Sequence, residues 1–162
     1  MREPTIDGRV LDVLLAFDAS GVSRAASVTD NAPLRSPAAE GPGARLPLAH
    51  YVARLRELMR RHGNPALALQ FGASVDIADL SLGAVIGAAC PSMDEAWAML
   101  NRYSALTIDV DAAHGGDRFV IERRAGETWI VDDRRDPNDS PEVTESTFAR
   151  IACTARRLCD AR

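Results

Sequence analysis

The sequence contains no lysine. All 19 basic residues among its 162 residues are arginines, so Schiff-base catalysis and acetylation on lysine are excluded. Cysteine is scarce as well, and the three cysteines form an odd, scattered set that does not build a closed disulfide framework: Cys90, Cys153 and Cys159. No apolar run approaches the ~20 residues that span a bilayer, so we expect no membrane partner.

An excess of positive charge is also missing. The net charge is −4 and the pI is about 5.4, whereas a nucleic-acid-binding module needs clustered positive charge to displace counterions from phosphates. The first residues lack the basic-then-apolar order of a signal peptide, which predicts a cytoplasmic location. With 46% apolar residues, the chain has the composition of a single domain that buries roughly 70% of its unfolded surface.

Apolar spacing predicts most of the helices. A short amphipathic helix is expected over 10–17, and a second helix starts near Pro47, because its apolar residues recur at three- and four-residue spacing until Gly63. Asn64 and Pro65 predict the start of another helix that ends near Gly72. The glycine-containing apolar stretch 80–89 is interpreted as a tightly packed buried helix.

The second half of the chain changes from helix to strand. Ser92 followed by Glu95 is a capping-box pattern that opens a helix reaching Tyr103. Alternating apolar residues on both sides of the turn at 125–126 predict a β-hairpin over 117–124 and 127–132, with 106–110 as a possible third strand. A last helix is expected over 140–160. The predicted fold is α+β, organised as an N-terminal helical arm at 1–30, a Pro/Gly loop at 31–46, a helical core at 47–105, strands at 106–133 and the C-terminal helix.

No motif for catalysis, a metal or a cofactor is recognisable. The most metal-like group is Asp109, Asp111, His114 and Asp117, but its spacing lacks the ligand and the glycine that an EF-hand loop needs, so a solvated turn is the simpler interpretation. Cys153 and Cys159 are six residues apart in a predicted helix and have no histidine nearby in sequence, which argues against zinc. We therefore expect a binding or regulatory protein rather than an enzyme.

Several short motifs occur in an order that resembles a known family. They are Leu46-Pro47-Leu48, the segment 64–72, Leu82-Gly83 with Gly87, the segment 91–96, and Arg102-Tyr103. Together they are similar to the N-terminal regulatory domain of a branch of the AraC-type bacterial transcription regulators, called the arabinose-binding domain. The resemblance implies a module that binds a small-molecule effector, forms a homodimer and controls how a DNA-binding domain engages its operator.

Two features depart from that family. Its members continue into further strands and a double helix-turn-helix domain, whereas these 162 residues contain no such DNA reader, so we expect contact with DNA only through a domain absent from this chain. A sugar site also needs several polar groups around an aromatic platform, and no such set is recognisable. The apolar stretches fit a small, partly apolar effector better.

The candidate ligand-binding residues come from the apolar segments of the predicted helices and hairpin. Filling of the core is the simpler interpretation for these side chains. Two alternatives to a sensor domain stay open: a protein–protein interaction module without a pocket, and a small enzyme assembled around His114 and the acidic loop. The candidate residues are Leu82, Ile86, Trp97, Leu100, Tyr103, Phe119 and Trp129.

Overall fold

The computed structural model describes residues 3–20, 44–80, 82–111, 116–134 and 138–160. The order of its elements confirms the predicted α+β class. In chain order they are β1 (Thr5–Asp7), α1 (Gly8–Ala19), β2 (Arg45–Pro47), α2 (Leu48–Arg61), α3 (Leu67–Ser74), α4 (Ile77–Leu80), α5 (Leu82–Ala88), α6 (Met93–Thr107), β3 (Ile108–Asp109), β4 (Phe119–Arg124), β5 (Glu127–Asp132) and α7 (Pro141–Asp160).

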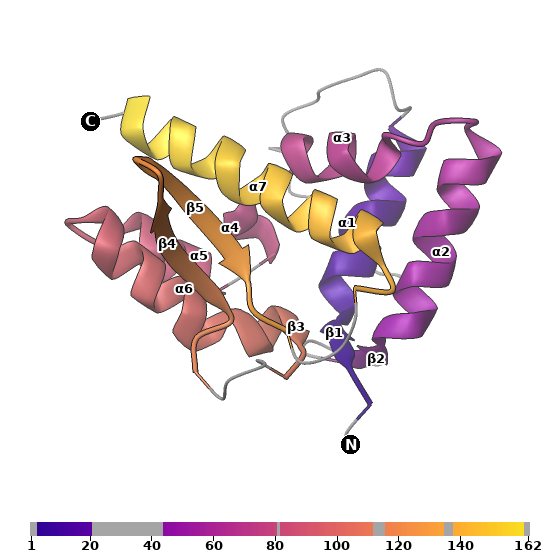
Figure 1. Cartoon of the computed structure of the whole chain (residues 1–162). Helices are drawn as coiled ribbons and strands as arrows, with labels where there is room; N and C mark the ends of the chain where they lie inside the picture. The colour runs from indigo at the N-terminus through magenta and orange to yellow at the C-terminus, as the bar shows by residue number, and fades with distance from the viewer. Residues whose placement is uncertain (1–2, 21–43, 81, 112–115, 135–137, 161–162) are drawn as a thin grey trace.

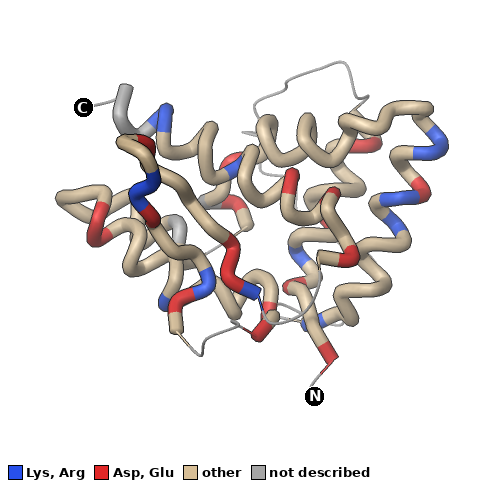
Figure 2. Tube along the Cα trace, in the orientation of Figure 1, with Lys and Arg blue, Asp and Glu red and all other residues tan. Residues whose placement is uncertain are grey.

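Helix α7 connects two groups of elements. Figure 1 shows it running diagonally across the molecule, from α1, α2 and α3 at one end to α5, α6 and the β4–β5 hairpin at the other. The main core lies in the first group, where α1 and α2 bury their apolar stripes against α3 and the three-stranded sheet. Its largest fully buried side chains include Tyr51, Phe71, Leu14 and Leu55. Basic and acidic residues follow one another along α2 (Figure 2), and two of them form ion pairs with neighbouring helices, Arg56 with Glu142 of α7 and Arg61 with Asp18 of α1.

The ends of α2 follow the sequence signals. Pro47 stands immediately before the helix, and Gly63 ends it with a φ of 57°, a left-handed conformation that glycine adopts without steric penalty. The Gly63 N–H donates to the Arg60 carbonyl and the Asn64 N–H to the Met59 carbonyl, so the last carbonyls of the helix are satisfied. The Asn64 side chain accepts a hydrogen bond from the Ala66 N–H at 3.0 Å and leads the chain into α3.

The crossing of α3 and α7 is set by Gly72. A Cβ atom at this position would lie 2.1 Å from the Ser146 carbonyl oxygen, so only glycine permits the two backbones to approach this closely. The helix ends at Ser74, in keeping with the end predicted near Gly72, but the glycine serves packing rather than termination.

The assignment of the third strand is also corrected. Residues Ile108–Asp109 form β3, but β3 pairs with β1 rather than with the hairpin. Strand β1 is central in an antiparallel sheet of order β2–β1–β3, and Arg45–Pro47, expected to be irregular loop, supplies β2. Sequence periodicity missed this sheet because each of its strands is only two or three residues long. The rest of the predicted Pro/Gly loop lies outside the described residues apart from Ala44.

The hairpin itself is confirmed. Ala125 and Gly126 both have positive φ, 49° and 85°, as a two-residue type I′ turn requires. The register pairs Phe119 with Asp132 and Glu122 with Trp129. Since directly opposed residues share a face, Trp129 lies on the opposite face of the hairpin from Phe119.

Side-chain hydrogen bonds attach the hairpin to α6. The buried Asn101 amide donates to the Phe119 carbonyl at 2.8 Å and accepts from the Phe119 N–H at 2.8 Å. The Trp97 indole N–H donates to the same carbonyl at 3.1 Å. Asn101 thus substitutes for a neighbouring strand, and β4–β5 needs no third strand to satisfy this peptide.

The stretch 80–89 differs from its prediction. It contains the end of α4 and the separate helix α5, and only one face of α5 is buried. Gly83 and Gly87 are buried, whereas Leu82 and Val85 are exposed on the outer face, so the expectation of a buried helix is wrong for that face. Within the described ranges, no helix is long and apolar enough to cross a membrane.

The α3–α7 crossing makes a stability prediction. Gly72→Ala should lower the free energy of unfolding by about 3 kcal/mol, because the new methyl group overlaps backbone that must shift. Urea denaturation followed by circular dichroism measures the change. Gly116→Ala is the matched control, since a Cβ there meets nothing within 4 Å. Equal stability of the two variants would contradict the role assigned to Gly72.

Candidate ligand-binding grooves

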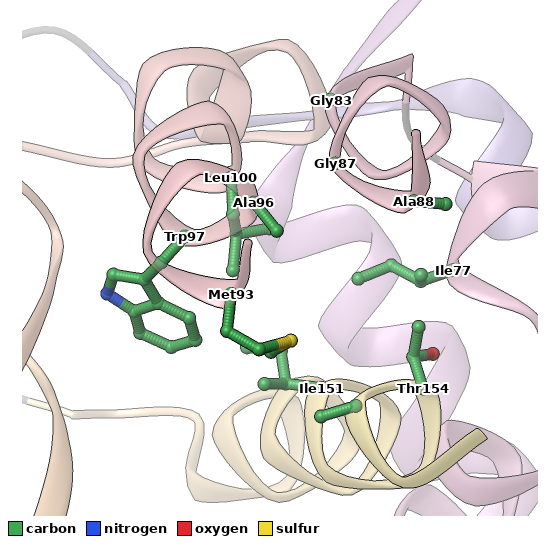
Figure 3. A pocket seen from close by; sticks show the side chains of 11 residues that line it. Ile77, Gly83, Gly87, Ala88, Met93, Ala96, Trp97, Leu100, Ile151 and Thr154 are labelled. Atoms are coloured by element: carbon green, nitrogen blue, oxygen red, sulfur yellow. The ribbon is translucent and has the colours of Figure 1, made fainter. Parts of the chain in front are cut away.

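Two neighbouring hollows lie along α7. The first, called groove 1, is open, has a volume of about 60 Å³ and lies between α5, α6 and α7, next to α4. Figure 3 shows Met93 and Leu100 on one side of it and Ile151 and Thr154 on the other. Its lining is almost entirely apolar: Ile77, Gly83, Gly87, Ala88, Met93, Ala96, Trp97, Leu100, Ile151, Thr154 and Ala155.

Small residues account for the shape of groove 1. Gly87 brings α5 close to α6, because a Cβ on it would already stand 3.4 Å from the Ala96 carbonyl oxygen. Ala88, Ala96 and Ala155 then leave space that larger side chains would fill. The Thr154 hydroxyl accepts a hydrogen bond from Arg157 at 3.2 Å. A ligand here would meet hydrocarbon surface and few polar partners.

The second hollow, groove 2, has a volume of about 40 Å³. It shares Ile77, Leu100 and Ile151 with groove 1, so these three side chains lie between the two hollows. Groove 2 differs from groove 1 in containing two arginines. Its full lining is Ile77, Leu80, Leu100, Ser104, Thr107, Ile108, Arg118, Phe119, Thr147, Arg150 and Ile151.

Arg118 is held in a buried ion-pair cluster. Its guanidinium donates to both carboxylate oxygens of Asp132, at 2.8 and 3.1 Å, and the two side chains are only 6% and 5% exposed. Arg134 reaches the same carboxylate at 3.1 Å. This two-point contact neutralises Arg118 and fixes the base of β4 against β5.

Arg150 has no such partner. It is 4% exposed, its Nη2 donates to the Ser146 hydroxyl at 3.2 Å, and its guanidinium carbon lies 5.6 Å from the centre of the Phe71 ring. Its Nε has no hydrogen-bond partner among the described residues. Burial lowers the pKa of the Arg150 guanidinium, and the nearby Tyr51 phenol acts against that shift.

Aromatic side chains connect the walls of the grooves. The Phe119 ring meets Trp97 of α6 at a centroid distance of 6.2 Å and Phe148 of α7 at 6.3 Å, both edge to face. This geometry is favourable for aromatic pairs. Because hydrogen bonds attach Phe119 to α6, movement of α7 relative to α6 would disturb its contact with Phe148.

The structure brings together three of the seven candidate residues. Trp97 lines groove 1, Phe119 lines groove 2, and Leu100 lines both. The other four residues, Leu82, Ile86, Tyr103 and Trp129, line neither groove. Leu82 and Trp129 are about half exposed, at 55% and 48%, while Ile86 and Tyr103 are half-buried. The expectation that the α6 residues point into a filled interior is corrected, because Trp97 and Leu100 are half-buried and face hollows.

Sequence reasoning missed the contributions of α4 and α7 to the grooves. Ile77, Ile151, Arg118 and Arg150 were not among the candidates. One signal was available for Arg150, since it stands seven residues after Val143 and thus on the apolar stripe of the last helix. A charged residue at such a position is unusual in a core-facing stripe.

The described residues contain no assembled metal site. No group of three or more His, Cys, Asp or Glu side chains could hold a metal ion within them, and His114 of the metal-like cluster lies outside that part of the chain. Cys90 and Cys153 are half-buried and form no disulfide among the described residues. Asp18 accepts hydrogen bonds from Arg61 and His62, and the bond from Arg61 is the main reason that its pKa is lowered. These contacts join the ends of α1 and α2.

Comparison with known families supplies an independent observation. Residues 23–162 match the family described as the arabinose-binding domain of AraC transcription regulator, N-terminal. The match begins after α1, although β1 and α1 contribute Ile6, Val10 and Leu14 to the core. No match was found among curated proteins or among solved structures.

The ion-pair cluster beside groove 2 makes a second stability prediction. Asp132→Asn should lower the free energy of unfolding by about 3 kcal/mol, because it leaves the buried Arg118 and the half-buried Arg134 without this counter-charge. Glu122→Gln is the control, since it removes an exposed partner of Arg124 and should change stability by less than about 0.5 kcal/mol. Urea denaturation at pH 7 measures both, and a small effect of Asp132→Asn would contradict the buried pairing.

Proposed function

The chain belongs to the family of arabinose-binding N-terminal domains of AraC transcription regulators, and from this membership we propose that it is the effector-sensing and dimerisation domain of such a regulator. The family is regulatory and not enzymatic. The step that reads DNA would belong to a helix-turn-helix domain outside these 162 residues. The proposed site of action is the cytoplasm, where the DNA is.

Groove 1 is the observation that carries the effector-binding part of the proposal. Its apolar lining with few polar groups is typical of small-molecule sites. Of the seven candidate residues, we assign ligand contact to Trp97, Leu100 and Phe119, and add Ile77 and Ile151 to them. This lining fits a partly apolar ligand better than it fits a pentose.

The position of α7 offers a route from ligand to regulation. The helix forms a wall of both grooves and also packs on α3 across the Gly72 contact. A ligand that binds better to one spacing of α6 and α7 shifts the population toward that spacing, and α7 then transmits the change. The free energy by which the ligand shifts this equilibrium is at most the difference between its binding free energies for the two states.

Exposed apolar side chains support the dimerisation part. Ile121 and Ile130 are directly paired across the hairpin and both are exposed, so they form one continuous apolar surface. Adjacent exposed apolar residues are typical of a protein–protein contact. We assign this surface to a second copy of the chain. An interaction module that lacks a ligand is the competing interpretation, and the ligand screen below decides between them.

A thermal-shift screen tests effector binding. The library covers fatty acids, amino acids, aromatic acids and pentoses, and a ligand at about 100 times its Kd should stabilise the fold by about 2.7 kcal/mol. Ala96→Leu should abolish the shift by filling groove 1, whereas Ala98→Leu on the exposed face of α6 should not. If no compound in the library gives a thermal shift while the protein is folded, the interaction module is favoured.

Sedimentation equilibrium tests the dimer. Ile130→Glu should convert the protein to a monomer, because a charge at the apolar hairpin surface must be desolvated when two copies meet. Leu69→Glu is the matched control, since Leu69 is similarly exposed but lies on α3. A monomeric wild-type protein, or a dimer that persists in Ile130→Glu, would contradict the assigned surface.

A further inference from the structure

Groove 2 contains a positive charge without a counter-charge. Neither groove includes an Asp or Glu among its lining residues. Arg118 does not need one there, because Asp132 already accepts two hydrogen bonds from it. Arg150 takes part in none of the ion pairs formed by the described residues, although it is 4% exposed. A buried charge left in this state is strongly unfavourable.

The neighbours of Arg150 are neutral. Ser146 accepts one hydrogen bond and the Phe71 ring contacts the guanidinium face, but neither carries a charge. Tyr51 is fully buried, and burial raises its pKa to about 12, so its phenol is protonated at neutral pH. Glu142, which precedes Arg150 by about two turns of α7, already accepts a hydrogen bond from Arg56.

The unused donors of Arg150 fit one chemical group well. Arginine offers five N–H donors in a planar fork. One of those of Arg150 donates to the Ser146 hydroxyl, and its Nε–H has no acceptor among the described residues. A carboxylate accepts two parallel hydrogen bonds from such a fork. It would also supply the negative charge that groove 2 lacks.

The structure assigns to Arg150 the binding of a carboxylate. We propose that the effector is a short monocarboxylate, with its anionic end in groove 2 and its apolar chain or ring in groove 1. The proposal rests on the effector-binding function proposed above and adds the chemical class of the ligand. Ile77, Leu100 and Ile151 line both grooves, so the two hollows adjoin where the apolar part of such a ligand would continue into its carboxylate end.

Matched pairs of probes test the charge requirement on the wild-type protein. Isothermal titration calorimetry would compare hexanoate with hexanamide, and phenylacetate with phenylacetamide. At least one carboxylate should bind roughly tenfold or more tightly than its amide, because a charge-assisted pair of hydrogen bonds is lost in the neutral probe. Equal binding within each pair would overturn the proposal.

Variants then assign the charge to Arg150. Arg150→Met should reduce the affinity for the carboxylate to that for the amide, while Arg150→Lys should retain part of the preference. Arg156→Met, an exposed position on the same helix, is the control and should leave both affinities unchanged. An unchanged carboxylate preference in folded Arg150→Met would overturn the proposal and leave Arg150 a structural residue packed on Phe71.

The two proposals fail in different ways. If none of the four probes binds while a pentose, the library class without a carboxylate, gives a thermal shift, the carboxylate proposal is overturned and the sensor function stands. If neither the probes nor the library bind, both proposals are overturned. The comparison of charged and neutral probes needs no variant, so it remains decisive even where a substitution at Arg150 prevents folding.

Discussion

The contact between Gly72 and the Ser146 backbone determines where α7 lies. Since a Cβ at position 72 would stand 2.1 Å from the Ser146 carbonyl oxygen, the two helices can approach only because no side chain intervenes. The consequences spread along α7. Phe71, beside the glycine, receives the guanidinium of Arg150 over its ring, and Ile151 in the following position forms part of both grooves. The lack of a side chain at Gly72 thus sets the position of α7, the longest of the described helices, which forms a wall of both grooves.

The two grooves combine an apolar surface with a nearby buried charge. Groove 1 results from glycine and alanine positions where helices approach without filling the space between them. Groove 2 adds Arg118, which is neutralised by Asp132, and Arg150, which has only neutral neighbours. A site of this composition selects ligands both by their charge and by the size of their apolar part. It offers a pentose few of the polar partners that its hydroxyl groups would need.

The hairpin contributes to the site through its attachment to α6. Asn101 makes two hydrogen bonds to the Phe119 peptide, which holds the Phe119 ring between Trp97 and Phe148. The contacts of Phe119 therefore depend on the distance between α6 and α7, the two helices that a ligand would contact. The N-terminal β1 and α1 complete the other end of the molecule, and their core residues show that the packed unit extends beyond the matched residues 23–162.

Local chemistry in the sequence determined the elements with strong start and stop signals. Gly63 ends α2, Ser92 caps α6 with a hydrogen bond from the Glu95 N–H at 3.2 Å, and the turn at 125–126 closes the hairpin, because each of these depends on neighbouring residues. Tertiary structure alone decided the pairing of β3 with β1. It also decided the placement of Arg150 beside α4 and α6. These features depend on contacts between segments far apart in the chain and on strands too short for periodicity to reveal, so one sequence read locally could not supply them.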